Sequence, residues 1–295
     1  MRYAVVTAAR DEAENLPRLA LALTAQTVRP EVWIIAENGS SDETAAVADG
    51  LAAQHPWIRV LRVAGADRPI RGAPIVRSFT AALESLVPPP DVVVNVDADV
   101  SFGDEYFERL LSAFASDPTL GIASGSAYEQ VDGAWRQRHV TGTTVWGATR
   151  AYRWSCLVDV LPLEERLGWD GIDEFKANML GWTTRTLLDL PFFHHRGEGG
   201  RERSSWHARS EQGRMAHYVG YRPSYLLLRA GFHAVRDPAA LGLLWGYAAA
   251  AARREPRCAD VRVLTYVQRQ QRLRNLPVRA RETLRPRLVL SRGPD

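Results

Sequence analysis

The feature that most limits the fold is an alternation of two hydrophobic periods over the first part of the chain. Runs such as Val92-Val-Val-Asn-Val96 are apolar at nearly every position, which is typical of strands buried on both faces. Segments with helical spacing, such as 16–25, separate these runs. Repeated strand and crossover helix predict an α/β fold with a mostly parallel sheet flanked by helices. The predicted strands are 3–7, 31–36, 57–63, 92–96 and 119–124, and the predicted helices are 16–25, 40–53, 74–86 and 104–115.

The pattern changes after about residue 200. Four segments with helical spacing follow, and Pro223, Pro238 and Pro256 separate them. We therefore expect an α/β domain over residues 1–205 and a helical C-terminal extension over residues 206–295. The predicted helices of the extension are 207–219, 223–235, 238–252 and 258–275.

Composition excludes several classes of protein. The chain is 46% hydrophobic and 24% charged, which is ordinary for a globular protein and argues against disorder. Its two cysteines, Cys156 and Cys258, are too few for a disulfide framework or for a zinc site built on paired cysteines. Charge interrupts the N-terminus too early for a signal peptide, and the apolar run 239–252 is too short to span a membrane. We expect a cytoplasmic protein.

The charge is unevenly distributed. The net charge is +3, but residues 253–295 contain 12 arginines and 4 acidic residues. This basic end suits anionic lipid head groups or a phosphorylated substrate, and it allows peripheral contact with the inner face of a membrane. The simpler interpretation is that arginine is the general surface cation, because the chain has a single lysine, Lys176. No basic patch interleaved with aromatic residues is present, so nucleic acid is not expected as a partner.

Polar clusters follow three of the predicted strands. They are 7–12, 37–44 and 97–99. Because the carboxyl ends of parallel strands meet at one edge of a sheet, where ligands bind, we expect these clusters to converge in one crevice. The second cluster includes Ser40-Ser-Asp-Glu43, whose spacing predicts a capping box that begins the next helix at Ser40.

The pair Asp97-Ala-Asp99 is the most informative of these clusters. Two carboxylates on one side of an extended segment repel each other unless a cation or hydrogen-bond donors lie between them. Mg²⁺ and Mn²⁺ bind one or two carboxylates together with phosphate oxygens of a substrate. A solvated strand end, with Asp99 capping the next turn, is the alternative. The chain has no P-loop string, which excludes that site, and no G-x-G-x-x-G after its first strand, which disfavours a standard dinucleotide fold.

Two further groups of residues could carry chemistry. Asp170, Asp173 and Glu174 precede an apolar helical segment, where a carboxylate suits either a general base or a helix cap. His194-His195-Arg196 follows a predicted strand near 185–193. A neutral imidazole there could bind a metal and the arginine a diphosphate, but for the pair taken alone surface or core histidines are the favoured interpretation.

In this order, the motifs resemble those of nucleotide-sugar glycosyltransferases with the GT-A fold, in particular the inverting family 2. The resemblance covers roughly residues 3–196. Departures are Asp11 in place of the usual Asn, Asn38 in place of the usual second Asp, and the reversed acidic pair Asp173-Glu174. The motifs that carry it are Ala9-Arg10-Asp11-Glu12, Glu37-Asn38-Gly39-Ser40-Ser41-Asp42-Glu43-Thr44, Asp97-Ala98-Asp99, and Asp173-Glu174 with Gly181-Trp182.

The resemblance implies roles for individual residues. Asp173 would be the general base, with Glu174 as the alternative. Asp99 would bind a divalent metal, Mg²⁺ or Mn²⁺, and His194 or His195 would be a third ligand. Residues 1–100 would form the nucleotide-sugar half of the domain and residues 101–205 the acceptor half. The implied nucleotide-sugar-binding residues are Thr7, Ala8, Ala9, Glu12, Glu37, Asn38, Ser40, Arg71, Gly72, Asp97 and Ala98.

The activity implied is transfer of a sugar from a UDP- or GDP-sugar to an acceptor hydroxyl, with inversion at C1. Transfer would be non-processive, since the membrane helices and the Q-x-x-R-W string of polymer synthases are absent from this sequence. A retaining GT-A enzyme and a non-catalytic nucleotide-sugar-binding relative remain alternatives. A nucleotidyltransferase is disfavoured because residues 7–11 contain no glycine. The sequence does not indicate the oligomeric state or the acceptor, for which a cell-envelope glycan is one of several options.

Overall fold

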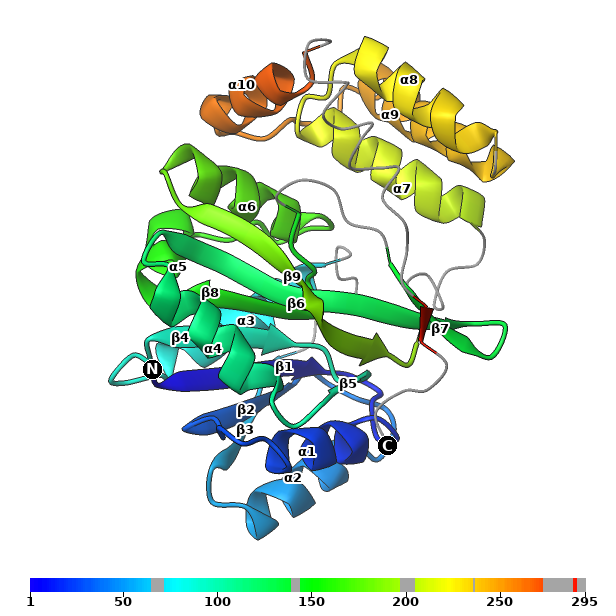
Figure 1. Cartoon of the computed structure of the whole chain (residues 1–295). Helices are drawn as coiled ribbons and strands as arrows, with labels where there is room; N and C mark the ends of the chain where they lie inside the picture. The colour runs from blue at the N-terminus through cyan, green and yellow to red at the C-terminus, as the bar shows by residue number, and fades with distance from the viewer. Residues whose placement is uncertain (65–71, 139–143, 197–204, 236, 273–288, 291–295) are drawn as a thin grey trace. The chain divides into compact units, whose positions relative to one another are not determined.

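The structure is a computed structural model that describes residues 1–64, 72–138, 144–196, 205–235, 237–272 and 289–290. The chain divides into two compact units (Figure 1). The first comprises residues 1–196 and 285–295 and is called the sheet unit below. The second comprises residues 197–284 and is called the helical unit.

The first half of the sheet is parallel. Its order is β3–β2–β1–β4, formed by Ile58–Arg62, Val32–Glu37, Tyr3–Ala9 and Val92–Val96. Strands β1, β2 and β4 are apolar at nearly every position because both faces of the sheet are covered there. Alternate residues such as Val5 and Val94 pack with α1 (Leu16–Thr24) and α4 (Tyr106–Ser116). The intervening residues pack on the other face with α3 (Ala73–Glu84), α5 (Trp154–Val160) and α6 (Trp169–Met179).

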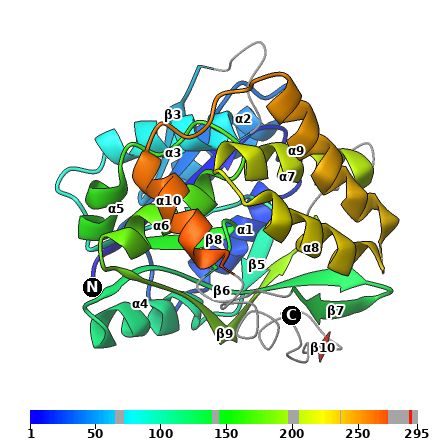
Figure 2. The same cartoon turned by 90° about the horizontal axis from the view of Figure 1, so that it is seen from above.

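The second half of the sheet is mixed. Strand β8 (Thr149–Arg153) pairs antiparallel with β4, and β6 (Leu120–Val131) pairs antiparallel with β8 but parallel with β9 (Thr183–His194). The short strand β5 (Val100–Phe102) pairs with β9, which lies beside β6 in both views (Figures 1 and 2). The predicted α/β class is confirmed, and the antiparallel pairs are confined to this half.

The far edge of the sheet ends in two short strands. Strand β7 (Ala134–Gln137) pairs with β6, and β10 (Val289–Leu290) pairs with β7. The sequence predicted a helical extension over all of 206–295, so the return of residues 289–290 to the sheet is a correction. A two-residue strand carries too little periodic pattern to be recognised from sequence.

The helix after β2 begins later than predicted. Helix α2 spans Thr44–Gln54, and no side chain caps its N-terminus, so the predicted capping box at Ser40 does not form. Instead, the backbone N–H of Ser40 donates to Glu37 Oε1 at 2.6 Å. Asp42 accepts from the backbone N–H of Thr44 at 2.9 Å. The polar residues of this segment therefore stabilise a turn after the strand.

The helical unit contains α7 to α10. Helices α7 (Ser205–Tyr218) and α9 (Gly242–Ala252) pack on each other, and α8 (Pro223–Ala234) packs on the short 3₁₀ helix η1 (Pro238–Leu241). Helix α10 spans Val261–Gln270. Within the described residues, none of the helices combines the length and the apolar character that crossing a membrane requires.

Candidate active site

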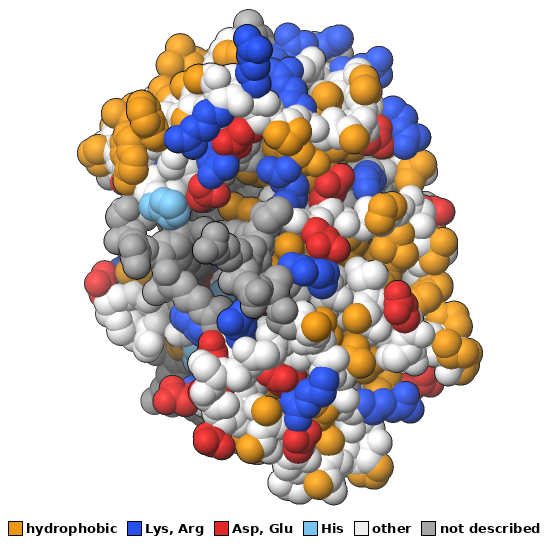
Figure 3. Space-filling view, turned by 180° about the vertical axis from the view of Figure 1, so that it is seen from behind, with side chains coloured by type: hydrophobic (Ala, Val, Ile, Leu, Met, Phe, Trp, Pro, Cys, Tyr) orange, Lys and Arg blue, Asp and Glu red, His pale blue; other side chains and the backbone are white. Residues whose placement is uncertain are grey.

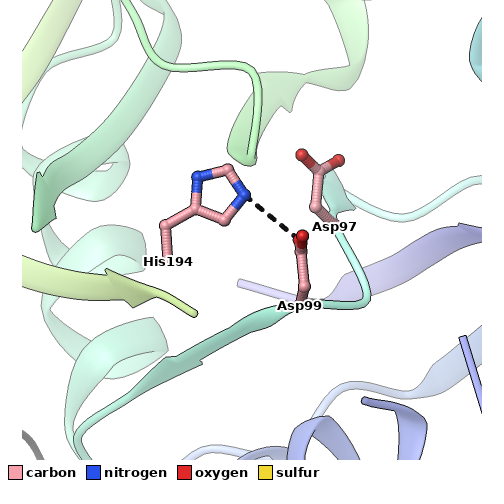
Figure 4. Close-up of side chains that lie close together, drawn as sticks. All are labelled: Asp97, Asp99 and His194. Carbon is pink, nitrogen blue, oxygen red and sulfur yellow. Dashed lines mark hydrogen bonds and ion pairs between the residues drawn. The ribbon is translucent and has the colours of Figure 1, made fainter. Parts of the chain in front are cut away.

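Two carboxylates and a histidine meet where β4 ends. Asp97 and Asp99 occupy the turn between β4 and β5, and His194 is the last residue of β9, opposite Val100. His194 Nε2 lies 3.1 Å from Asp99 Oδ1 (Figure 4). One potential ligand atom from each of the three residues lies within 4.8 Å of the others. Segments far apart in the sequence thus converge on one half-buried cluster, called the open cluster below.

The two aspartates of the open cluster differ electrostatically. Burial raises the pKa of Asp97 to about 6, and the negative charge of Asp99 adds to this shift. Burial also acts to raise the pKa of Asp99, but the hydrogen bond and charge of His194, together with the charge of Arg196, outweigh it and lower that pKa. Burial acts to lower the pKa of His194, but its hydrogen bond to Asp99 and the negative charges of Asp99 and Asp97 outweigh it and raise that pKa. Asp99 is therefore the stable anion of the cluster.

Arg196 connects the open cluster to the loop after β1. Its Nε lies 3.2 Å from Asp99 Oδ2, and its guanidinium also donates to Glu12. Glu12 is held in turn by Asn15, whose amide donates to it at 2.6 Å. The side chain of Arg196 is 30% exposed, so this cation is not sealed into the core. It lies where the sequence predicted a diphosphate, beside the aspartate predicted to bind a metal.

The loops after β1 and β2 are joined by hydrogen bonds. Asp11, at φ +56°, accepts from the backbone N–H of Ser41 at 2.7 Å, and Ser40 Oγ accepts from the backbone N–H of Asp11 at 3.2 Å. The backbone N–H of Glu12 donates to Thr44 Oγ1 at 2.7 Å. The polar clusters 7–12 and 37–44 therefore form one rim that these hydrogen bonds hold together.

Glu37 and Asn38 are both buried at this rim. Glu37 accepts from Ser40 and pairs with Arg62 at 3.3 Å. Burial acts to raise the pKa of Glu37, but these two partners outweigh it and lower that pKa. Asn38 donates from its amide to Ser78 Oγ at 3.3 Å, while its Oδ1 is buried and has no partner among the described residues.

Some of the predicted nucleotide-binding residues face the core. Thr7 is fully buried, and its hydroxyl accepts a hydrogen bond from the Trp33 indole at 3.0 Å. Strand alternation turns this side chain inward, so a contribution of Thr7 to the predicted nucleoside pocket would come from its backbone. Ala9 and Ala98 are also buried in the core, whereas Ala8 is half-buried.

Gly72 closes the loop that precedes α3. It has φ +87°, and a Cβ at this position would overlap the backbone carbonyl of Arg166. Only glycine satisfies both the left-handed backbone and the close approach. Gly72 therefore fixes the start of α3 against the segment before α6. Arg71, predicted beside it, lies outside the described residues.

The acidic pair of α6, Asp173 and Glu174, is buried and bonded to neighbouring residues of the core. Asp173 Oδ1 accepts from Arg150 Nη2 at 2.6 Å, Oδ2 accepts from Arg150 Nε at 3.2 Å, and the Tyr152 hydroxyl also donates to Oδ2. The side chains of Arg150 and Asp173 are 0% and 1% exposed. Glu174 is buried beside them and accepts from the backbone N–H of Val145 at 3.0 Å. These residues are called the closed cluster below.

The closed cluster argues against the predicted role of Asp173 as general base. A base must reach the acceptor hydroxyl within hydrogen-bond distance, and both oxygens of Asp173 are occupied by internal donors. Burial raises the pKa of Asp173 to about 6 and that of Glu174 to about 8, with the charge of Arg150 opposing both shifts. The contacts indicate a structural role for both acids, which connect α6 to Arg150, Tyr152 and Val145.

Asp170, in the first turn of α6, has a different environment. It is half-buried, and within the described residues its carboxylate makes no hydrogen bond or ion pair. Its Oδ2 lies 3.2 Å from the position that a Cβ on Gly147 would occupy. The adjacent Ala148 accepts a hydrogen bond from the Asp97 backbone at 2.9 Å, and the negative charge of Asp170 helps to raise the pKa of Asp97. Asp170 therefore lies near enough to the open cluster for its charge to act on Asp97.

The two histidines also have different environments. His194 contacts Asp99, whereas His195 Nε2 is within 2.7 Å of Ser101 Oγ and its ring packs edge-on against Trp135. Burial, together with the charge of Arg18, lowers the pKa of His195. Of the two candidate ligands, only His194 lies within the cluster that could hold a metal.

The donor set of the open cluster fits a hard divalent cation. Carboxylate oxygens are the preferred protein ligands of Mg²⁺ and Mn²⁺, and one imidazole completes a site that still needs oxygen ligands from a substrate or water. Burial and then the charge of Asp99 raise the pKa of Asp97, and a cation between the two carboxylates would offset their like charge. The residues present therefore suit the predicted metal.

Solved structures with the same fold are glycosyltransferases of the GT-A class. A mannosyltransferase from Pyrobaculum calidifontis, in complex with GDP-Man and Mn²⁺, is 17% identical with a TM-score of 0.57, covering 96% of this chain and 83% of that one. S. aureus TarS 1–349 in complex with UDP-GlcNAc is 16% identical with a TM-score of 0.55, covering 74% and 66%. GalNAc-T7 with UDP, GalNAc and Mn²⁺ is 12% identical with a TM-score of 0.59, covering 81% and 51%.

The family is established by sequence. The family model described as glycosyl transferase family 2 matches residues 4–162, more than half of the chain. The chain therefore belongs to glycosyl transferase family 2, which confirms the predicted resemblance. A curated relative, the beta-monoglucosyldiacylglycerol synthase of Synechocystis sp., is 29% identical over 177 residues, which is 55% of this chain and 32% of the relative. This chain thus matches about a third of that relative's length.

Sequence reasoning noted but did not select two residues that lie beside the open cluster. Arg196 was recognisable only as an arginine after two histidines, and Asp170 only as one acid of three. The signal that separates Asp170 from Asp173 is the buried Arg150 on β8, and its position beside α6 depends on an antiparallel strand pair.

Proposed function

We propose that the chain transfers a sugar from a nucleoside diphosphate sugar to an acceptor hydroxyl, with the help of a divalent cation and with inversion at C1. The observation that carries this proposal is the open cluster at the carboxyl end of β4, where Asp97, Asp99 and His194 converge. In α/β sheets this edge is where nucleotides bind. Family membership supports the reaction class, and complexes of structural neighbours with UDP-GlcNAc, GDP-Man and Mn²⁺ support the donor and the cation.

Departure of the nucleoside diphosphate develops negative charge that must be neutralised. A bound Mg²⁺ or Mn²⁺, held by Asp99 and His194 with Asp97 beside them, would supply positive charge to the diphosphate oxygens. Arg196 is a second cation at the same place, and its planar guanidinium suits bidentate contact with phosphate. Its present partners, Asp99 and Glu12, hold it in position for that contact.

In this proposal, Asp170 acts as the general base. Its half-buried carboxylate is the acid of α6 that remains unpaired among the described residues and faces the strand end bearing Asp97. It would accept the proton of the acceptor hydroxyl as that oxygen attacks C1 from the side opposite the diphosphate. Proton transfer by a positioned side chain contributes about 10² to 10⁴ in rate.

Donor binding is the first experiment. Calorimetric titration of UDP-, GDP- and dTDP-sugars, with Mn²⁺ and with chelator, would be carried out on the wild type, Asp99→Ala and the exposed control Asp104→Ala. We expect one nucleotide class to bind tightly only with Mn²⁺, Asp99→Ala to lose that binding and Asp104→Ala to keep it. If no member of the panel binds to any variant, the chain is a non-catalytic relative.

The base is tested by substitution at both candidate acids. Asp170→Asn keeps size and should lower turnover about 10³-fold while donor affinity stays near that of the wild type. Asp173→Asn should instead lower thermal stability. Full activity of Asp170→Asn, or loss of activity in a fully folded Asp173→Asn, would return the role to Asp173. The anomeric configuration of the product, read by NMR, decides between inversion and retention.

A further inference from the structure

The helical unit exposes large hydrophobic side chains in one part of its sequence. Trp245 is 62% exposed, Phe232 is 48% exposed and Val235 is 87% exposed. Isolated exposed hydrophobic residues are ordinary in proteins, but several within a short stretch indicate an interaction surface. We define the α8–α9 face by six residues: Leu227, Leu228, Phe232, Val235, Leu241 and Trp245.

Helical spacing collects these residues into stripes. On α8, Leu228, Phe232 and Val235 are separated by four and three positions. From the end of η1 along α9, Leu241, Trp245 and the exposed Ala248 repeat that spacing. Residues at such intervals lie on one side of a helix. Helices α8 and α9 lie side by side in Figures 1 and 2, and Figure 3 shows hydrophobic side chains gathered over α9.

The core of the helical unit does not need this stripe. The opposite side of α9 presents Gly242 and Gly246, where an added Cβ would overlap the backbone of α7 at Trp206 and Ser210. The two helices are therefore packed nearly backbone to backbone through small residues. Trp245 has no place in that contact and is directed outward.

The charge that is left unpaired near the α8–α9 face is positive. Residues 205–272 contain four acidic residues, and each pairs with an arginine. These pairs are Arg209 with Asp237, Arg214 with both Glu211 and Glu255, and Arg262 with Asp260. Arg253, Arg254 and Arg257, which follow α9 directly, are exposed and have no acidic partner among the described residues. The face therefore combines an apolar surface with unneutralised positive charge.

We propose that the α8–α9 face docks on the surface of a lipid bilayer that contains anionic head groups. Apolar side chains with a tryptophan among them enter the boundary between head groups and acyl chains, and arginines beside them attract anionic lipids. A second copy of the chain is the less suitable occupant, because a two-fold contact would bring like-charged arginines together. The described helices lie on such a surface without crossing it.

Vesicle sedimentation tests the proposal without any sugar donor, so its outcome is independent of the transferase activity. The full chain is mixed with vesicles of phosphatidylcholine containing about 30% phosphatidylglycerol, or with phosphatidylcholine alone. We expect binding to the anionic vesicles that weakens at high salt. The double variant Phe232→Ser/Trp245→Ser should weaken binding about tenfold or more, and Arg253→Gln/Arg254→Gln should weaken it several-fold.

Leu21→Ser provides the matched control. Leu21 is 74% exposed on α1 of the sheet unit, so the variant removes a comparable exposed apolar side chain elsewhere. It should sediment like the wild type, and circular dichroism establishes that every variant is folded. Equal loss of binding in Leu21→Ser, no binding by the wild type, or self-association without lipid that Phe232→Ser/Trp245→Ser abolishes would each overturn the proposal, the last in favour of a second copy.

Discussion

The open and closed clusters contain the same kinds of residue and differ in how their charges are satisfied. In the closed cluster, Arg150 and Tyr152 occupy both oxygens of Asp173, and solvent is excluded. In the open cluster, Asp97 and Asp99 repel each other, and Arg196, the cation beside Asp99, is partly exposed. What differs is solvent access: Asp173 is neutralised by a fully buried arginine, whereas His194 and Arg196, the partners of Asp99, are partly exposed. Access for a ligand therefore separates the two clusters.

The largest effect is expected from a substitution that disrupts the closed cluster. Arg150→Met leaves Asp173 and Glu174 buried without their cation, so the free energy of unfolding should fall by about 3–5 kcal/mol. Urea denaturation followed by circular dichroism measures it. The double variant Arg150→Met/Asp173→Asn should recover part of the loss, because one unpaired charge has been removed. A loss below about 1 kcal/mol in Arg150→Met would mean that the cluster is hydrated and open.

A second prediction concerns the pH dependence of stability. The pKa of Glu174 is raised to about 8 in the folded chain from an ordinary value near 4.5, so the folded state binds an additional proton between these values. The free energy of unfolding should therefore fall as the pH rises through this range. Glu174→Gln, which removes the charge, should flatten the fall and be more stable at pH 8 by at least about 1 kcal/mol.

Urea denaturation of the wild type and Glu174→Gln at pH 6, 7 and 8 measures this difference. Glu164→Gln, a substitution outside the closed cluster, serves as the control and should leave the slope unchanged. Parallel curves for the wild type and Glu174→Gln would show that Glu174 is ionised throughout.

The third prediction concerns Arg196, the cation beside the open cluster. Arg196→Gln should lower donor affinity about tenfold, because it removes one of the cations available to the diphosphate. Its effect on stability should be small, under about 1 kcal/mol, since the side chain is partly exposed. Titration with the donor and urea denaturation separate the two effects. A stability loss comparable with that of Arg150→Met would place Arg196 in a closed cluster instead.

The smallest effect is expected at the rim. Arg62 pairs with Glu37 at 3.3 Å and with Asp49 at 2.6 Å, but its side chain is 46% exposed. Arg62→Ala should therefore change the free energy of unfolding by less than about 1 kcal/mol. Donor affinity should remain within a few-fold, because Glu37 keeps its bond from Ser40. A large loss of affinity would show that Arg62 itself contacts the donor.

Much of the fold could be predicted from sequence because buried parallel strands have an unmistakable pattern. Strands 3–7 and 92–96 were predicted within two residues of β1 and β4, and the helical segments of the second unit were found from proline breaks. The start of α2 was misplaced because Ser40 and Glu43 have capping-box spacing but serve the turn and the loop after β1. Local spacing does not reveal a long-range hydrogen bond.

The site was predictable as a set of segments and less so as a set of side chains. Asp97, Asp99 and His194 were brought together as their positions after strands suggested. The inward orientation of the Thr7 side chain was not predicted, because the sequence does not fix which residues of β1 face the core. Asp173 and Asp170 lie one helical turn apart, and what separates them is Arg150, which reaches α6 from an antiparallel strand that sequence reasoning did not foresee.

Gly72 carries a consequence for how the chain tolerates mutation. Its backbone lies against the carbonyl of Arg166, a few positions before the helix that presents Asp170. Any larger residue at position 72 would have to displace that segment, and with it the orientation of α6. Replacement of this glycine would thus appear in a mutational screen as a loss of turnover, although residue 72 takes no part in proton transfer. The contact between residue 72 and the segment at Arg166 thus links two stretches that lie far apart in the sequence.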